Sequence, residues 1–206
     1  MSPRKRAPAK PERPARGAPH ETRARLVTTA ATVFNTQGYD GTDSNKLANA
    51  AGYAAGTFYK HFRDKRELFL AVYEDWVDTE WRAIGQTLTD REAPDTPRKR
   101  RARAKEIVEM LLEHHKRWAG VRRSLRRLVA EDEQARVFYL AQRRRQLDTL
   151  SRLGSSRGRV STEEDAVLLY TLERCADAFA EGELEELRLS EAGYRALLVD
   201  LVERRL

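Results

Sequence analysis

Three observations predict an all-α protein with about nine helices. Apolar residues recur every three or four positions along most of the chain, and no segment alternates with a period of two for long enough to form a strand. Glycine and proline separate the periodic segments. At 206 residues, 40% of them hydrophobic and 34% charged, the chain has the composition of a folded protein and the length of one large domain or of a small domain joined to a larger one.

The chain begins with a basic, proline-rich segment. Residues 1–18 hold six basic side chains against Glu12, a local charge of +5 out of a total of +7. Four prolines exclude a helix there, so residues 1–19 are expected to form a flexible basic arm. The arm is either a solubilising tail or a segment that contacts phosphates or enters a minor groove of DNA.

Four helices are expected in the first ninety residues, over 22–36, 43–51, 55–62 and 65–89. Gly38 is a natural stop for the first helix, and Thr42 or Asp43 can cap the second. Gly52 ends the second helix, and the third follows after only a few residues. Lys65 opens the long fourth helix.

Five further helices follow a loop marked by Pro94 and Pro97. The first of them carries an apolar stripe from Ala104 to Trp118. The others are expected over 121–130, 132–153, 162–181 and 190–205, with a loop at 154–158.

The two short helices at about 43–62 have the form of a helix-turn-helix motif. The second helix of such a motif must be polar on one side to enter a major groove about 12 Å wide, and apolar on the other. Phe58 and Phe62, four residues apart, form the apolar side. The residues expected to face DNA are Ala55, Gly56, Thr57, Tyr59, Lys60 and His61.

A longer pattern joins these residues: Thr22, Ala30-Ala31, Phe34, Gly38-Tyr39, Thr42, Leu47-Ala48, Ala51-Gly52, Gly56-Thr57-Phe58-Tyr59, His61-Phe62, Lys65 and Leu68. In this pattern, residues 20–80 resemble the DNA-binding domain of the TetR family of bacterial regulators. The resemblance implies that Thr42, Ser44, Asn45 and Lys46 meet phosphates from the first helix of the motif. It also implies that Lys65 holds a phosphate at the start of the next helix.

Two residues depart from the family's pattern. Ala54 stands where the family usually has a serine that caps the recognition helix, and loss of such a cap costs about 1 kcal/mol. Ser44 replaces a residue that is usually apolar. Neither departure removes the helix-turn-helix motif.

For residues 81–206 the resemblance implies a helical domain that binds an effector and forms a dimer. The implied pocket is lined by Trp76, Trp81, Leu111, His115, Trp118, Phe138, Tyr139, Gln142 and Tyr170. The implied dimer interface, a four-helix bundle with a second subunit, uses Leu169, Leu172, Ala176, Phe179, Tyr194, Leu197, Leu198 and Leu201. His115 is either a core histidine or a ligand contact. Basic runs such as Arg122-Arg123 and Arg143-Arg144-Arg145 are either solvated helix faces or an attraction for an anionic effector.

The sequence therefore predicts a sequence-specific regulator of transcription, most simply a repressor that a small molecule releases from its operator. The expected partners are double-stranded DNA, a second copy of the chain and a small hydrophobic or amphipathic effector. The alternative is a constitutive architectural DNA-binding protein without an effector. No catalytic set, cofactor motif or metal-spaced His/Cys cluster is found, so no enzyme, cofactor or metal is expected. The single Cys175 and the lack of a long apolar run are typical of a cytoplasmic protein without a membrane segment.

Overall fold

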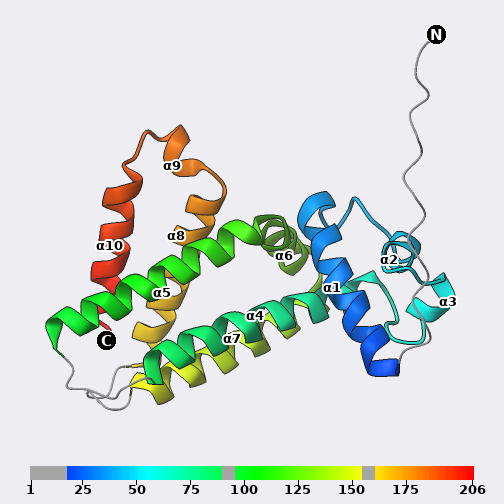
Figure 1. The fold of residues 1–206 in the computed structure, drawn as a ribbon, viewed down its shortest axis with the longest axis horizontal. Helices are drawn as coiled ribbons and strands as arrows, with labels where there is room; N and C mark the ends of the chain where they lie inside the picture. Colours follow the sequence, from blue (N-terminus) through cyan, green and yellow to red (C-terminus); the bar gives the residue numbers. More distant parts are fainter. Residues whose placement is uncertain (1–17, 90–95, 155–160) are drawn as a thin grey trace, which may run out of the picture. The chain divides into compact units, whose positions relative to one another are not determined.

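The all-α prediction is confirmed in the computed structural model, which describes residues 18–89, 96–154 and 161–206 (Figure 1). Within these ranges there are ten helices and no strand. They are α1 (Pro19–Gln37), α2 (Ser44–Ala50), α3 (Ala55–Phe58), α4 (Lys65–Thr89), α5 (Pro97–Arg117), α6 (Ala119–Glu131), α7 (Glu133–Gly154), α8 (Thr162–Ala180), α9 (Glu183–Glu186) and α10 (Glu191–Glu203).

Nine helices were expected, and the additional one is the single turn α9. It follows Gly182, whose φ of 82° lies in the left-handed region that glycine adopts without strain. Four residues are too few to show an apolar period, so the sequence pattern gives no sign of this helix.

Helix α1 begins three residues earlier than the apolar period indicates. Pro19 occupies the first helical position, where a missing N–H costs nothing, and the Ala18 N–H donates to the Glu21 carboxylate at 3.0 Å. The expected basic arm at 1–19 therefore ends in a helix, and its residues 1–17 lie outside the described ranges.

The chain divides into two compact units, Met1–Val72 and Tyr73–Leu206. The sequence placed the boundary at residue 80, later in the same helix α4. Trp76, Val77 and Glu80 are buried and belong to the second unit, so its interior starts before the expected boundary.

The first unit has an interior of aromatic and aliphatic side chains. Phe34 of α1 meets Phe69 of α4 edge to face, with ring centroids 5.0 Å apart. Leu47 and Ala48 of α2 are fully buried beneath them, as the helical spacing predicts. This interior fixes α2 and α3 against α1.

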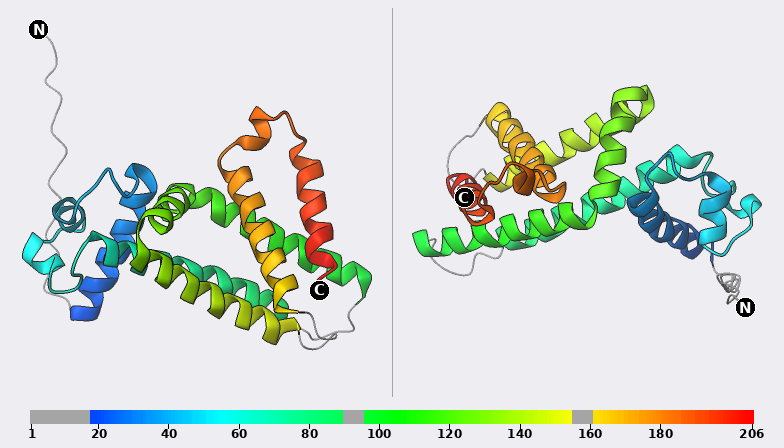
Figure 2. Two further views of the ribbon diagram at one scale, coloured as in Figure 1. Left: turned by 180° about the vertical axis from the view of Figure 1, so that it is seen from behind. Right: turned by 90° about the horizontal axis from the view of Figure 1, so that it is seen from above.

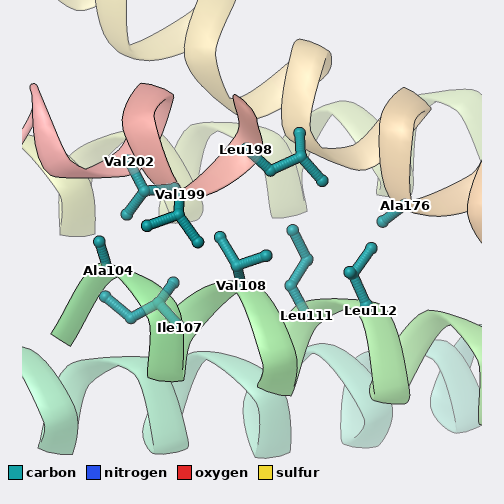
Figure 3. Close-up of a cluster of buried hydrophobic side chains, with 9 residues drawn as sticks. All are labelled: Ala104, Ile107, Val108, Leu111, Leu112, Ala176, Leu198, Val199 and Val202. Atoms are coloured by element: carbon teal, nitrogen blue, oxygen red, sulfur yellow. The ribbon is translucent and has the colours of Figure 1, made fainter. Parts of the chain in front are cut away.

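The second unit has an apolar cluster between α5, α8 and α10 (Figure 3). Side chains from one face of α5 point toward the facing sides of α8 and α10. The cluster comprises Ala104, Ile107, Val108, Leu111, Leu112, Ala176, Leu198, Val199 and Val202. Figure 2 shows α8 and α10 lying side by side, joined through α9.

None of the helices that the structure describes combines the length and the hydropathy needed to cross a lipid bilayer.

Candidate nucleic-acid interface and ligand-binding region

Helix α2 presents its polar side chains from a well-capped start. The Asp43 carboxylate accepts a hydrogen bond from the Lys46 backbone N–H at 2.8 Å, which caps the helix as the sequence predicts. This backbone hydrogen bond also lowers the pKa of Asp43. Asn45 and Lys46 are exposed and Ser44 is half-buried.

Helix α3 is shorter than the predicted span of 55–62. Regular helix ends at Phe58, because Lys60 and His61 donate to the carbonyls of Thr57 and Phe58, at 3.3 and 2.9 Å, and tighten the backbone into turns. At its start Ala54 offers no side-chain cap, in agreement with the departure noted in the sequence.

The two sides of the α3 segment differ as the sequence predicts. Phe58 and Phe62 are buried, whereas Lys60 and Tyr59 are exposed, Tyr59 to 56%. Gly56 is also exposed, and a Cβ atom added there would meet nothing within 4 Å. Ala55, Thr57 and His61 are partly buried. We define the recognition surface as Ser44, Asn45, Lys46, Ala55, Gly56, Thr57, Tyr59, Lys60 and His61.

Two residues of the predicted DNA-binding set, Lys65 and Thr42, meet at the turn between α1 and α2. The Lys65 ammonium donates to the carbonyls of Tyr39 and Thr42, at 2.8 and 3.0 Å, and lies 4.0 Å from the centre of the Tyr39 ring. Burial lowers the pKa of Lys65. The Thr42 side chain is itself buried. Both residues fix the turn between α1 and α2, and we leave them out of the recognition surface.

Sequence reasoning missed two arginines that hold the motif in place. Arg25 of α1 donates from Nε to the Ala51 carbonyl at the end of α2, 3.1 Å away. The Arg23 guanidinium lies 5.1 Å from the centre of the Phe62 ring. Their positions on the polar side of α1 resemble those of solvated charges, so the apolar period could not single them out.

Comparison with known proteins agrees with this geometry. Residues 26–72 match the family described as bacterial regulatory proteins, tetR family. The chain is 39% identical over 54 residues to the HTH-type transcriptional regulator AcrR of Shigella flexneri. It is 35% identical over 68 residues to the HTH-type transcriptional activator FasR of Mycolicibacterium smegmatis. These matches cover 26% and 33% of this chain, and only 25% and 31% of the two relatives.

Solved structures extend the likeness to the whole fold. The fatty acid degradation regulator FadR of Bacillus halodurans has a TM-score of 0.67 at 18% identity, over 92% of this chain and 97% of that one. A TetR-family regulator of Mesorhizobium loti has a TM-score of 0.71 at 21% identity, over 93% and 98%. The fold is thus a helix-turn-helix domain followed by a helical domain. Residues 26–72 thus match the TetR family, and the described helices share the fold of solved TetR-family regulators.

The residues predicted to line an effector pocket separate into several environments. Trp76, His115 and Gln142 are buried within the second unit. Phe138 and Tyr139 are half-buried and lie against the Tyr73 ring, with centroids 6.5 and 6.3 Å away.

Four residues of that predicted set lie elsewhere. Leu111 belongs to the apolar cluster between α5, α8 and α10 (Figure 3). Tyr170 is 48% exposed. The apolar stripe of α5 is buried as predicted, and its Leu111 packs toward α8 and α10. Trp81 and Trp118 are half-buried.

The interior beside Trp76 holds four charged residues, which we call the buried ion-pair cluster: Arg122, Arg143, Glu173 and Asp177. Arg122 donates to both carboxylate oxygens of Asp177, each at 3.0 Å, and to Glu173 at 3.4 Å. Arg143 makes a two-pronged contact with Glu173. The basic runs containing Arg122 and Arg143 were interpreted as either solvated faces or an anion site, whereas these two members are buried and paired.

His115 and Glu80 adjoin this cluster. His115 Nδ1 lies 2.9 Å from Asp177 Oδ1, and His115 Nε2 lies 3.8 Å from Glu80 Oε1. Burial disfavours the charged form of Asp177, but hydrogen bonds from His115 and Arg122 outweigh it and hold its pKa well below the usual range. Burial, with the nearby negative charge of Glu173, raises the pKa of Glu80 to about 8.

The residues predicted to form the dimer interface divide by exposure. Leu169, Ala176 and Leu198 are buried within the chain itself, because α8 and α10 bury these faces in their own unit, and this part of the prediction is corrected. Leu197 is 70% exposed. The remaining members are half-buried: Leu172, Phe179, Tyr194 and Leu201.

Proposed function

We propose that this protein is a transcriptional regulator that binds an operator through the recognition surface, as a homodimer, and leaves it when a small molecule binds the second unit. The observation that carries the proposal is the α3 segment, with buried Phe58 and Phe62 on one side and exposed Gly56, Tyr59 and Lys60 on the other.

The recognition surface has the chemistry that operator binding requires. Lys46 and Lys60 supply positive charge for phosphates, and Tyr59 supplies a hydroxyl and a flat ring for base edges. Because Gly56 has no side chain and open space above it, the backbone of α3 can approach the DNA closely.

We propose dimerisation through exposed apolar side chains of α8 and α10. Val167 and Tyr170 on α8 and Leu197 on α10 are exposed, and such side chains are typical of protein interfaces. A dimer also suits an operator with two half-sites about 34–36 Å apart. Leu197→Arg should sediment as a monomer, whereas Val137→Arg, an equally exposed site on α7, should remain a dimer. A dimeric Leu197→Arg protein would contradict this interface.

We further propose that an effector acts by preferring a conformer that does not fit the operator. Repression is the simpler outcome, because a protein bound over a promoter excludes polymerase. The relative FasR, described as an activator, marks the other possible outcome of binding.

Fluorescence anisotropy tests this proposal by measuring the affinity of the protein for two duplexes at about 150 mM salt. One duplex is the DNA upstream of the protein's own gene, and the other is a scrambled duplex of the same composition. We expect a specificity ratio of roughly 10³ or more. Lys60→Ala should weaken binding, whereas Lys105→Ala, an exposed lysine on α5, should not. Equal affinity for both duplexes with a steep salt dependence would instead indicate the architectural alternative. Failure to bind either duplex or to enrich any sequence from a randomised pool would overturn the proposal.

A further inference from the structure

Two buried polar atoms of the second unit face each other without hydrogen-bond partners: Glu80 Oε1 of α4 and His115 Nε2 of α5, 3.8 Å apart. We propose that this pair is the recognition point of the effector, and that it binds the protonated nitrogen of a small organic cation, an ammonium or an amidinium group. The inference rests on the proposed function only in naming that ligand as the effector.

The hydrogen-bonding pattern makes His115 Nε2 an acceptor. Its Nδ1 lies 2.9 Å from Asp177 Oδ1, and burial lowers the pKa of His115, so the ring is neutral at pH 7. An ionised carboxylate can only accept, so the single ring proton is on Nδ1 and donates to Asp177. The lone pair of Nε2 therefore points toward Glu80. A ligand group with two N–H donors satisfies both atoms at once.

The charges around the pair leave Glu80 without a counter-ion. Glu80 is faced by His115 from α5, Arg122 from α6, Arg143 from α7, and Glu173 and Asp177 from α8. Arg122 and Arg143 pair with the two carboxylates of α8, and the partly exposed Arg126 contacts both Asp177 and Glu181, so each of these guanidinium groups has another carboxylate as its partner. Within the described part of the second unit, Glu80 has no lysine or arginine partner.

A cation would therefore take the place of a proton. Burial raises the pKa of Glu80 to about 8, so without a ligand the carboxyl group is mostly protonated at pH 7. A bound ammonium or amidinium supplies the missing positive charge, and the carboxyl proton leaves to the solvent. An anionic ligand gains nothing from this pair, and a neutral ligand displaces no proton.

Aromatic rings beside the pair suit the body of such a ligand. The Trp76 ring centroid is 5.8 Å from that of His115, and the Tyr73 ring stacks on Trp76 at 5.5 Å. The Arg122 guanidinium lies over the Trp76 ring, 5.3 Å from its centroid, because aromatic faces attract cations through their quadrupole. The buried Trp76 Nε1 and Tyr73 hydroxyl also have no hydrogen-bond partner, which provides further polar contacts for a ligand.

The test measures binding to the full chain without DNA, by titration calorimetry. The probes are benzylamine, phenethylamine and benzamidine, each paired with a neutral analogue of the same shape: benzyl alcohol, 2-phenylethanol and benzamide. We expect at least one cation to bind tenfold or more tightly than its analogue. Binding at pH 7 should release roughly 0.9 proton, measured in two buffers of different ionisation enthalpy, because the pKa of Glu80 is about 8. Affinity should fall about tenfold when the pH is lowered from 7 to 6.

Glu80→Gln keeps the side-chain shape and should abolish both the preference for the cation and the proton release. Asp75→Asn, an exposed site on the same helix, should change neither. Equal binding of the neutral analogues, binding without proton release, or no binding by any cation would overturn the inference. An operator released by an uncharged compound would contradict this inference and leave the proposed function standing. Cation binding that leaves operator affinity unchanged would leave the cation site standing and contradict the proposed control of operator binding by this ligand.

Discussion

The two units of this protein differ in what they bury. In the described part of the first unit, the only buried polar residues are Thr22 and Thr42, and neither is charged. Within its described residues the second unit buries nine polar side chains: Glu80, His115, Arg122, Gln142, Arg143, Gln146, Asp165, Glu173 and Asp177. A unit whose functional polar residues lie at its surface can have an apolar core. Even when buried charges are paired, they often stabilise a fold no more than apolar residues of the same volume, so stability alone does not account for them in the second unit.

The largest expected effect comes from breaking the buried ion-pair cluster. Asp177→Asn removes the charge that Arg122 contacts through both carboxylate oxygens, and it leaves a buried guanidinium without its main counter-ion. We expect the free energy of unfolding to fall by about 3–5 kcal/mol in chemical denaturation.

The matched control for this variant is Glu131→Gln, which removes an exposed ion pair with Arg127. Its cost should be at most about 1 kcal/mol. If Asp177→Asn lowered the free energy of unfolding no more than this control, the buried ion-pair cluster would contribute no more to stability than an exposed ion pair.

The next effect is a difference between the two units in how stability depends on pH. The folded protein holds the Glu80 proton up to a pKa of about 8, whereas the unfolded chain releases it near 4.5. The stability that this group contributes is complete below pH 4.5 and is lost as the pH rises toward 8. Relative to the wild type, Glu80→Gln should therefore gain about 1.4 kcal/mol of stability per pH unit across that window.

Urea denaturation of both proteins at several pH values between 4.5 and 8 measures this difference. Glu67→Gln in the first unit is the control, and its difference from the wild type should stay nearly constant across this window and change only below about pH 4.5. A backbone hydrogen bond from Arg63 lowers the pKa of Glu67, so its contribution is present at neutral pH and is lost on acidification. A constant difference between Glu80→Gln and the wild type would show that Glu80 is ionised in the folded protein.

A smaller effect concerns the surface of the first unit. In Gly56→Ala the new methyl group meets no protein atom, and alanine favours a helix over glycine by up to about 1 kcal/mol. The fold should be retained or slightly stabilised. Operator affinity should nevertheless fall about 10- to 100-fold, because the methyl group occupies the space of close approach. Unchanged operator affinity in anisotropy measurements would mean that the DNA does not approach the backbone at Gly56.

The contrast between an apolar first interior and a charged second interior also explains what the sequence could predict. The apolar period predicted the inward Phe58 and Phe62 and the outward Tyr59, because helical spacing reports which side of a helix meets water. It could not predict that Arg122 is buried. Its partner Asp177 is 55 positions away in the sequence, and an arginine in a basic run looks like a solvated charge until the tertiary fold is known. The family resemblance predicts that Lys65 holds a phosphate, and it could not show that the Lys65 ammonium also contacts two carbonyls of the preceding turn.

The smallest effect tests whether the missing cap of α3 matters. Ala54 has the extended backbone of an N-cap, with φ −76° and ψ 154°, but its side chain cannot accept a hydrogen bond. Ala54→Ser should add that acceptor and stabilise the first unit by about 1 kcal/mol. Ala50→Ser, at the exposed end of α2 and away from any N-cap, controls for the hydroxyl itself and should give no such gain. If Ala54→Ser raised operator affinity without raising stability, the hydroxyl would be acting on a phosphate. If Ala54→Ser raised stability and operator affinity in proportion, the helical order of α3 would limit binding. A helix that is already formed before it docks on DNA loses less conformational entropy on binding.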